Sequence, residues 1–480
     1  MIVQKFFLLF ALLVLGFPLA KGQSVVRIDP DDRMDVILQK ASSVVPSKRQ
    51  LEWQKMEFTL FVHFGMNTFT NREWGEKGTP ASTFNPTALD AEQWAITARD
   101  AGATLILMVA KHHDGFCLWP SKYTEYSVKN SPWKGGNGDV VAEVSAACRK
   151  YGLKFGVYLS PWDINSPLYG TDEYNTYFKN QLKELLTQYG EISEVWFDGA
   201  CGEGANGKKQ VYDWSGYYSV IRELAPDAVI AVMGPDVRWV GTESGYGRET
   251  EWSVVPATAA ILDQIANSSQ KENLNAAFNP YRDMMEEDLG SREKIVKADG
   301  LIWYPSEVDV SIRDGWFYHA SQDSTVKSPE KLVDIYYSSV GRNSLLLLNV
   351  PPDKRGLIHE KDVASLKGMR KMLDKTFSKV ILADTNPVAI DNIFEYSLAQ
   401  PENFDVLLLQ EDVTKGQRIE KFRLEICKDG QWMEVVKGTT IGYKRLLKFD
   451  KTRAEKIRVH ILESRAEPAI KTIKIFNSPQ

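Results

Sequence analysis

Short apolar runs alternate with longer amphipathic segments from about residue 50 to residue 375 of the chain. The apolar runs predict buried strands, and the amphipathic segments predict helices. The expected strands are 58–64, 104–110, 154–159, 192–197, 228–233 and 344–350, and the expected helices are 90–101, 139–151, 172–189, 212–224, 328–339 and 360–373. Strands that alternate with helices in this way form parallel sheets. About eight strands are expected, with some intervening helices missing, which predicts an irregular α/β fold of the (β/α)8, TIM-like barrel kind.

The pattern changes at two places along the chain. Residues 235–325 hold many Gly, Pro and acidic residues and few helix signals, and long loops of this kind usually build the binding face of a barrel. After about residue 376, short runs separated by turn signals predict strands at 404–409, 423–427, 432–436, 445–449, 456–461 and 470–475. This second pattern is typical of a β-sandwich. We therefore expect a barrel over residues 23–375 and a C-terminal β-sandwich accessory domain over residues 376–480.

The first 22 residues have the features of a signal peptide. Lys5 supplies a positive charge, residues 6–20 are almost entirely apolar, and Ala20-Lys21-Gly22 offers small residues for cleavage before Gln23. The apolar stretch is short for a membrane span, and no later segment has a long uncharged apolar run. The expected location is therefore periplasmic or secreted, without membrane insertion after cleavage.

Composition and charge restrict the class of protein further. Hydrophobic residues make up 43% and charged residues 25% of the chain, which is typical of a globular protein. The formal net charge of −5 becomes −7 when the two lysines of the leader are removed, so that nucleic acid is not an expected partner. Four cysteines without a Cys-x-x-Cys pair argue against a disulfide framework and a structural zinc site. The 13 tryptophans offer flat surfaces that suit the apolar faces of sugar rings.

Side chains capable of chemistry follow three of the expected strands. His63 lies at the end of the first strand, His112 and His113 follow the second, and Asp198 follows Trp196 at the end of another. A single residue of this kind is most often a structural or turn residue. Because the C-terminal ends of parallel barrel strands meet at one face, the group together favours a shared pocket. The histidines lack His-x-His or His-Glu-x-x-His spacing, so we expect them to hydrogen-bond to sugar hydroxyls rather than to bind metal.

A carboxylate at the mouth of a barrel can attack an anomeric carbon, and this places Asp198 among the candidate catalytic groups. Such a reaction needs a second carboxyl group that donates a proton to the leaving oxygen. The candidates for this second group are Glu243, Glu249 and Glu251, with the weaker candidates Glu73 and Glu307. Residue types and spacing do not choose among the first three.

Several segments together resemble glycoside hydrolase family 29, the retaining α-L-fucosidases. The matching segments are Phe61-Val62-His63-Phe64-Gly65, Glu73-Trp74, Lys111-His112-His113-Asp114-Gly115-Phe116, Gly156-Val157-Tyr158-Leu159-Ser160-Pro161-Trp162-Asp163 and Glu194-Val195-Trp196-Phe197-Asp198-Gly199. The resemblance covers essentially the whole expected barrel. It implies that Asp198 is the nucleophile and that the fucose pocket is lined by His63, Glu73, Trp74, His112, His113, Tyr158 and Trp196.

The segment Arg238-Trp239-Val240-Gly241-Thr242-Glu243 is similar to the branch of this family that prefers α-1,3 and α-1,4 linkages in branched, Lewis-type glycans. The resemblance implies that Glu243 is the acid/base. Residues 303–307 and 313–316, including Trp316, are also similar to this branch, and the resemblance implies that they shape the side of the pocket that holds the aglycone. The implied activity is that of a retaining exo-α-L-fucosidase, which acts on fucosylated oligosaccharides by double displacement and needs no metal or organic cofactor. The alternatives are a fucose-binding protein without turnover and a metal-dependent hydrolase that uses the histidine pair.

Overall fold

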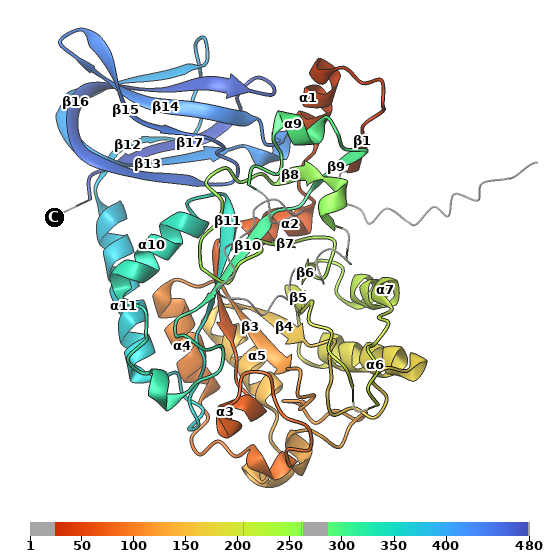
Figure 1. The fold of residues 1–480 in the computed structure, drawn as a ribbon. Helices are drawn as coiled ribbons and strands as arrows, with labels where there is room; N and C mark the ends of the chain where they lie inside the picture. The colour runs from red at the N-terminus through yellow and green to blue at the C-terminus, as the bar shows by residue number, and fades with distance from the viewer. Residues whose placement is uncertain (1–24, 205, 261, 263–286, 479–480) are drawn as a thin grey trace, which may run out of the picture.

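Eight parallel strands form a nearly closed barrel. The computed structural model describes residues 25–204, 206–260, 262 and 287–478 (Figure 1), so the expected signal peptide at residues 1–22 lies outside the described residues. The strand order is β6-β5-β4-β3-β2-β11-β10-β7, and a parallel bridge between Ala231 and Val237 joins the two edges. The bounds are β2 Phe58–Val62, β3 Leu105–Lys111, β4 Lys154–Leu159, β5 Glu194–Phe197, β6 Val229–Val232, β7 Arg238–Trp239, β10 Ser306–Ser311 and β11 Ser344–Asn349. The prediction of an irregular (β/α)8 barrel is confirmed.

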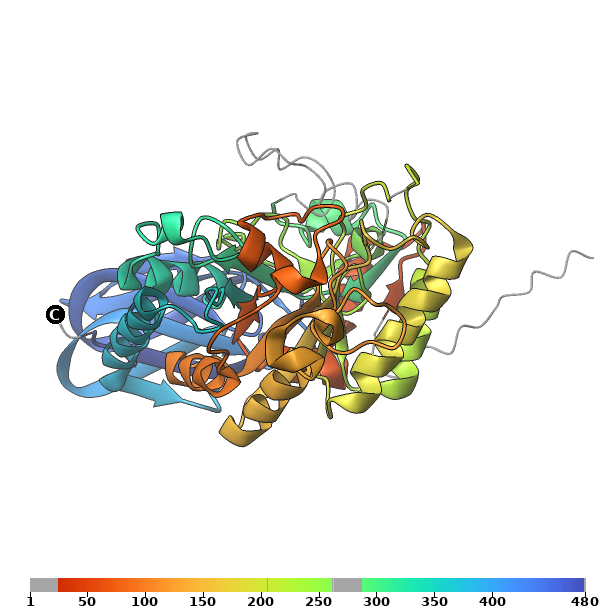
Figure 2. The same ribbon diagram turned by 90° about the horizontal axis from the view of Figure 1, so that it is seen from below.

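Local signals in the sequence determine where the barrel helices begin and end. In α4, the Asp90 side chain accepts a hydrogen bond from Gln93 N, and the helix ends at Gly102, whose φ is 91°. In α5, Asp139 caps the first turn in the same way, and the helix ends at Gly152. The helices are α3 Met66–Thr70, α4 Ala91–Ala101, α5 Val140–Tyr151, α6 Asp172–Gln188, α7 Trp214–Leu224, α9 Arg292–Ile295, α10 Pro329–Ser339 and α11 Glu360–Ser378. Figure 2 shows helices packed around the strands, with α6 and α7 on the side away from the C-terminal sheet.

The region 235–325 contains a barrel strand that the apolar pattern does not predict. The side chains of β10 are all buried, yet Ser306, Glu307, Asp309 and Ser311 are polar, so the segment does not read as an apolar run. No helix separates β6 from β7. Val232 has a φ of 64°, which a β-branched residue rarely adopts, and the chain turns there directly into the next strand.

Two short helices and a small sheet lie beside the barrel. Helix α1 (Met34–Ser43) packs its buried Ile37 and Ala41 with Trp303 of the antiparallel sheet formed by β1 (Val25–Arg27), β9 (Gly300–Trp303) and β8 (Val254–Pro256). Helix α2 (Lys48–Gln54) begins with a capping box between Ser47 and Gln50. Its Trp53 belongs to the barrel core.

The C-terminal part is one antiparallel sheet that folds over itself. Its order is β12-β17-β13-β16-β14-β15, with bounds β12 Val380–Asp384, β13 Ile393–Glu411, β14 Ile419–Lys428, β15 Gln431–Gly438, β16 Arg445–Ser464 and β17 Ile470–Phe476. Register shifts interrupt the long β13–β16 pair. The C-terminal half of β16 also pairs with β14, and the C-terminal part of β13 also pairs with β17. Side chains from β13, β14, β16 and β17 enclose one apolar core, as in a β-sandwich. The strands expected at 445–449 and 456–461 are two parts of β16.

Polar contacts join the sheet to the barrel. Arg445 binds Glu249, Lys444 binds Glu57, and the side-chain oxygen of Gln417 accepts a hydrogen bond from Ser253 N at 2.7 Å. Helix α11 ends at Ser378 and β12 begins at Val380, close to the expected junction, while the domain limits themselves stay a prediction. None of the helices in the described part of the chain has the length and apolar character that a membrane span requires.

Candidate active site

Asp198 directly follows β5, at the face where the parallel strands end. Its Oδ1 accepts a hydrogen bond from Ala200 N at 2.8 Å, and its Oδ2 accepts one from the Tyr158 hydroxyl at 3.1 Å. His113 Nε2 lies 3.7 Å from the same Oδ2. Both carboxylate oxygens are therefore held in place, while 24% of the side chain remains exposed for a ligand.

The three candidate histidines lie in one group at the ends of β2 and β3. The ring centroids of His112 and His113 are 4.1 Å apart, and those of His63 and His112 are 5.7 Å apart. Burial lowers the pKa of His63 to about 3 and lowers the pKa of His112 and His113 as well. The rings are therefore neutral at physiological pH and offer hydrogen bonds rather than positive charge.

The hydrogen-bond network determines which nitrogen of two histidines faces the site. The Asn349 amide nitrogen donates to Ser311 Oγ and Trp316 O, so its oxygen accepts from His63 Nδ1 at 2.9 Å. Ser160 Oγ donates to Trp162 O and therefore accepts from His113 Nδ1 at 2.7 Å. In both neutral rings Nε2 is left as an acceptor, which suits a donating sugar hydroxyl.

Aromatic side chains build the floor and the rim. The rings of Trp196 and Tyr158 stack with centroids 5.2 Å apart and an interplanar angle of 28°. Trp74 is 50% exposed and stacks on His113 at 5.3 Å, and Trp316 lies 5.1 Å from His63. These flat surfaces suit the apolar parts of a sugar.

Glu243 follows β7 and lies at the exposed rim of the same group. The Trp316 indole N–H donates to its Oε2 at 3.1 Å. Desolvation raises the pKa of Glu243, the indole donor opposes this, and the charges of Asp198 and Glu73 raise it further. The two carboxyl groups therefore differ: the carboxylate of Asp198 accepts two hydrogen bonds, and the raised pKa of Glu243 keeps its proton to higher pH. Acid-assisted displacement needs one carboxyl group of each kind.

The other candidate carboxyl groups have other partners. Glu249 binds Arg445 and Arg342, and Glu251 is buried with Arg238 and Arg248. These ion pairs favour Glu243 over both of them as the proton donor.

The weaker candidates Glu73 and Glu307 are also engaged. Glu73 Oε2 accepts the backbone N–H groups of Trp316 and Phe317, and its Oε1 lies 2.6 Å from His319 Nε2, so it links the loops after β2 and β10. Glu307 lies beneath Trp196 and accepts its indole N–H at 2.8 Å.

All ten residues expected in the site therefore belong to one connected group. The residues expected from the sequence do not include two further members of this group: Asn349, which orients His63, and His319, which binds Glu73. Asn349 stands at the end of the apolar run of β11 and could have been found by the strand-end pattern that identified Asp198. His319 gives no such signal, because it lies within a loop.

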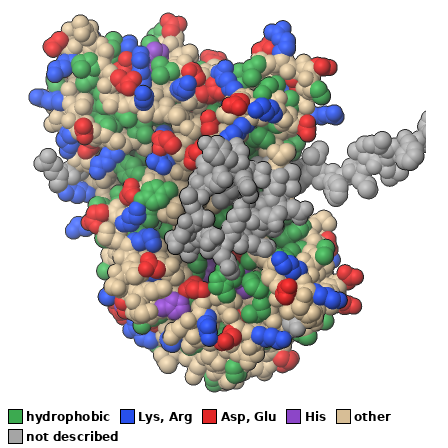
Figure 3. Space-filling view, viewed as in Figure 1, with side chains coloured by type: hydrophobic (Ala, Val, Ile, Leu, Met, Phe, Trp, Pro, Cys, Tyr) green, Lys and Arg blue, Asp and Glu red, His purple; other side chains and the backbone are tan. Residues whose placement is uncertain are grey.

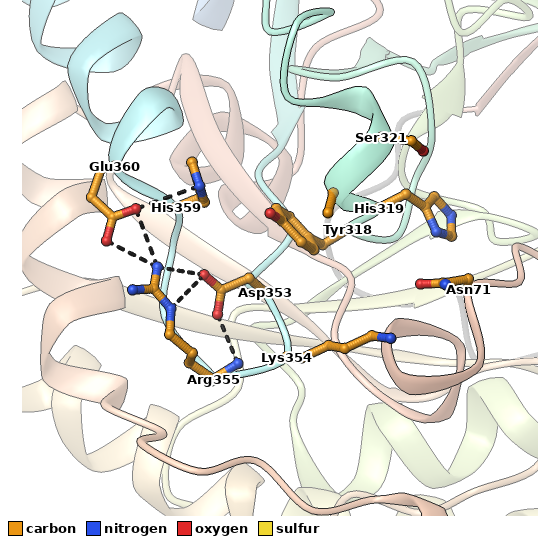
Figure 4. Close-up of a pocket in the computed structure, with 10 residues that line it drawn as sticks. Asn71, Tyr318, His319, Ser321, Asp353, Lys354, Arg355, His359 and Glu360 are labelled. Atoms are coloured by element: carbon orange, nitrogen blue, oxygen red, sulfur yellow. Dashed lines mark hydrogen bonds and ion pairs between the residues drawn. The ribbon is translucent and has the colours of Figure 1, made fainter.

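A cavity of about 660 Å³ adjoins this group on the same face of the barrel. Its wall comes from the loops after β2, β10 and β11, through Asn71, Tyr318, His319 and Lys354 among others (Figure 4). Asp353 and Glu360 both bind Arg355 at one end of it. His319 lines the cavity and also contacts Glu73, so the cavity directly neighbours the candidate site.

The surface view gives no sign of a single-charge patch on the face it shows: acidic and basic side chains are interspersed over both halves of the molecule (Figure 3). No group of three or more His, Cys, Asp or Glu within the described ranges is arranged to hold a metal ion. The four cysteines are free thiols.

Comparison with known proteins connects this geometry to one family. The family model for alpha-L-fucosidase matches residues 42–376. Alpha-L-fucosidase 1 of Arabidopsis thaliana is 41% identical over 468 residues, which cover 90% of this chain and 87% of the relative. A solved glycoside hydrolase 29 family member from a rumen bacterium is 40% identical, with a TM-score of 0.79 and coverage of 91% and 78%. A Ruminococcus gnavus GH29 fucosidase in complex with fucose is 30% identical, with a TM-score of 0.76 and coverage of 91% and 96%.

Proposed function

The chain belongs to the alpha-L-fucosidase family, glycoside hydrolase family 29, and from this premise we propose that it is a retaining exo-enzyme that removes terminal L-fucose by double displacement. The observation that carries the mechanism is the pair of unlike carboxyl groups in one site. Asp198 is held by two donors with an exposed edge, and its charge acts on Glu243, which contacts Trp316.

In the proposed reaction, Asp198 attacks C1 of the fucosyl group while Glu243 donates its proton to the departing oxygen. The C1–oxygen bond of the glycoside breaks as the bond from C1 to Asp198 forms. Glu243, now a carboxylate, takes a proton from water, and the resulting hydroxide displaces Asp198 from C1. Two displacements at one carbon restore the starting configuration, and they need carboxyl groups about 5–5.5 Å apart.

The remaining site residues are proposed to bind the fucosyl ring. The neutral rings of His63, His112 and His113 accept or donate hydrogen bonds to its hydroxyls, and Tyr158 fixes the nucleophile. Trp196 and Trp74 pack against the apolar face and the methyl group. Glu73 and Trp316 join the loops that border Glu243, so they lie where the leaving group departs.

We propose a preference for α-1,3 and α-1,4 linkages on branched oligosaccharides. The cavity lined by His319 and Lys354 supports this, because His319 contacts Glu73 beside the Trp316 loop and the cavity offers space for further sugars. The comparison of a branched α-1,3/1,4-fucosylated oligosaccharide with a linear α-1,2 isomer tests the preference. A higher kcat/KM on the linear isomer would contradict it.

The mechanism itself is tested with a fluorogenic fucoside, followed by NMR of the sugar at early times. Retention gives α-L-fucose as the first product, whereas β-L-fucose would contradict double displacement. A protein that only binds fucose would release no fluorophore.

We also propose that the protein is exported, on the basis of its first 22 residues. N-terminal sequencing of the protein from the periplasm or the medium should begin at Gln23. Intact protein that starts at Met1 and stays inside the cell would contradict export.

A further inference from the structure

Two glutamates meet inside the barrel, beneath the floor of the active site. Glu194 comes from β5 and Glu307 from β10, and both are fully buried. Glu194 Oε2 accepts the Trp53 indole N–H at 3.2 Å, and Glu307 Oε2 accepts the Trp196 indole N–H at 2.8 Å. Within the described part of the chain, the Oε1 atom of each has no donor.

The two carboxyl groups lie within interaction distance of each other, and a proton between them would give one Oε1 atom the donor that it otherwise lacks. The donors that the described residues give to the pair are two neutral indoles, and two buried charges without a cation would be costly. Burial raises the pKa of Glu307 well above its ordinary value, and Glu194 raises it further. Burial raises the pKa of Glu194 to about 7, and its bond with Glu307 acts in the opposite direction. The pair therefore retains a proton to higher pH than an ordinary carboxyl group does.

We propose that Glu194 and Glu307 share one proton, and that this acid pair positions Trp196 in the floor of the active site. Trp196 stacks on Tyr158, and the Tyr158 hydroxyl donates to Asp198 Oδ2 at 3.1 Å. A displaced Trp196 would therefore disturb both the sugar-binding surface and the nucleophile. The link to catalysis rests on the proposed function, whereas the shared proton does not.

The ionisable groups that act on the pair are few. Asp309, two residues from Glu307 on β10, accepts the Trp239 indole N–H at 2.8 Å, and burial, the charge of Glu243 and the Glu307 carboxyl group all raise its pKa. Trp53 from α2 and Trp196 from β5 supply neutral donors. The folded protein retains this proton to higher pH than the unfolded chain does. The contribution of the pair to the free energy of unfolding is therefore present at low pH, and it is lost as the pH rises from the ordinary carboxyl pKa through the pKa of the folded state.

The first measurement detects the proton directly. Infrared spectra of the full chain at neutral pH should show the carbonyl stretch of a buried protonated carboxyl group, and this band should be weaker in Glu307→Gln than in the wild type. The glutamine amide can accept from Trp196 and donate to Glu194, so it imitates the protonated acid. Glu184→Gln is the matched control, because Glu184 is a buried carboxyl group that accepts the Trp119 indole N–H at 2.8 Å and a backbone N–H at 2.9 Å without a second carboxyl group. An unchanged band in Glu307→Gln overturns the shared proton.

The second measurement follows Tm against pH between about pH 5 and pH 9. Glu307→Gln should lose less Tm across this range than the wild type, whereas Glu184→Gln should follow the wild type. If Glu307→Gln falls as steeply as the wild type, the proton is not dissociating from this pair.

The third measurement tests positioning with a fluorogenic fucoside. Glu307→Ala removes the acceptor of the Trp196 N–H and should lower kcat/KM about tenfold or more, while Glu307→Gln should recover most of that loss. If Glu307→Gln is folded by circular dichroism and as impaired as Glu307→Ala, Glu307 does not act by holding Trp196. Failure of the proposed function is distinguishable, because then the wild type itself releases no fluorophore while the infrared and Tm results stand.

Discussion

The substitution Glu243→Gln separates proton transfer from every other part of the proposed mechanism. The glutamine oxygen can still accept the Trp316 indole N–H, which donates to Glu243 Oε2 at 3.1 Å, so the rim of the site keeps its geometry. What the variant loses is the acidic proton of the first displacement and the carboxylate base of the second. Desolvation and the charges of Asp198 and Glu73 retain this proton in the wild type by raising the pKa of Glu243.

The size of the effect depends on the leaving group. A positioned general acid contributes about 10²–10⁴-fold, or about 2.7–5.5 kcal/mol of transition-state stabilisation. A sugar alcohol departs poorly as an alkoxide, so a fucosylated oligosaccharide should lose about this full factor in kcat/KM. An aryl fucoside with an electron-withdrawing ring departs without protonation and should lose less than about tenfold in its first step.

The assay measures kcat/KM of Glu243→Gln on both substrates beside Glu249→Gln. Glu249 is a matched control, because it lies in the same segment but binds Arg445 and Arg342 away from Asp198. If Glu243→Gln loses the same factor in kcat/KM on both substrates, the assignment of Glu243 as the acid is refuted. It is also refuted if Glu249→Gln, instead of Glu243→Gln, loses more on the oligosaccharide than on the aryl fucoside.

Four further substitutions test the nucleophile, the pKa of the acid and a buried ion pair. Asp198→Ala should abolish nearly all turnover, and azide should restore it with formation of the inverted fucosyl azide, seen by NMR. Glu73→Gln removes a charge that raises the pKa of Glu243, so the alkaline limb of kcat/KM should move to lower pH, whereas Trp316→Phe removes a donor that lowers this pKa and should move the limb to higher pH. Glu251→Ala leaves the buried Arg238 without its carboxylate and should cost about 3–5 kcal/mol of unfolding free energy in denaturant titrations.

Each of these has a contrary result. A fucosyl azide with retained configuration would contradict the role of Asp198 as nucleophile. If Glu73→Gln and Trp316→Phe shift the alkaline limb of kcat/KM in the same direction, the pKa of Glu243 does not set that limb. The control for Glu251 is Glu463→Ala at an exposed pair with Lys421, 2.8 Å apart, where a loss below about 1 kcal/mol is expected. Equal losses at the two positions would contradict the importance of burial.

Much of the barrel could be predicted because its elements carry local signals. The run Lys154–Leu159 is a strand with the expected bounds, and Asp90 and Gly102 mark the ends of α4 as their types indicate. Strand β10 could not be predicted in this way, since Glu307 and Asp309 are buried by partners from other strands. The C-terminal runs at 445–449 and 456–461 predicted strand structure but not that both belong to β16, because continuity across a bend depends on pairing with β13.

The sequence by itself determined most of the barrel helices and apolar strands and several of the side chains at strand ends, because caps, apolar runs and strand-end positions are local properties. It also identified the family, through motifs that keep their order along the chain. Residue types and spacing left Glu243, Glu249 and Glu251 open, and contacts that favour Glu243 appear only in the tertiary structure, since Arg445, which binds Glu249, lies 196 residues away along the chain. The same holds for the meeting of Glu194 and Glu307: burial and charge depend on what surrounds a group in space, and that is decided only when distant strands close into a barrel.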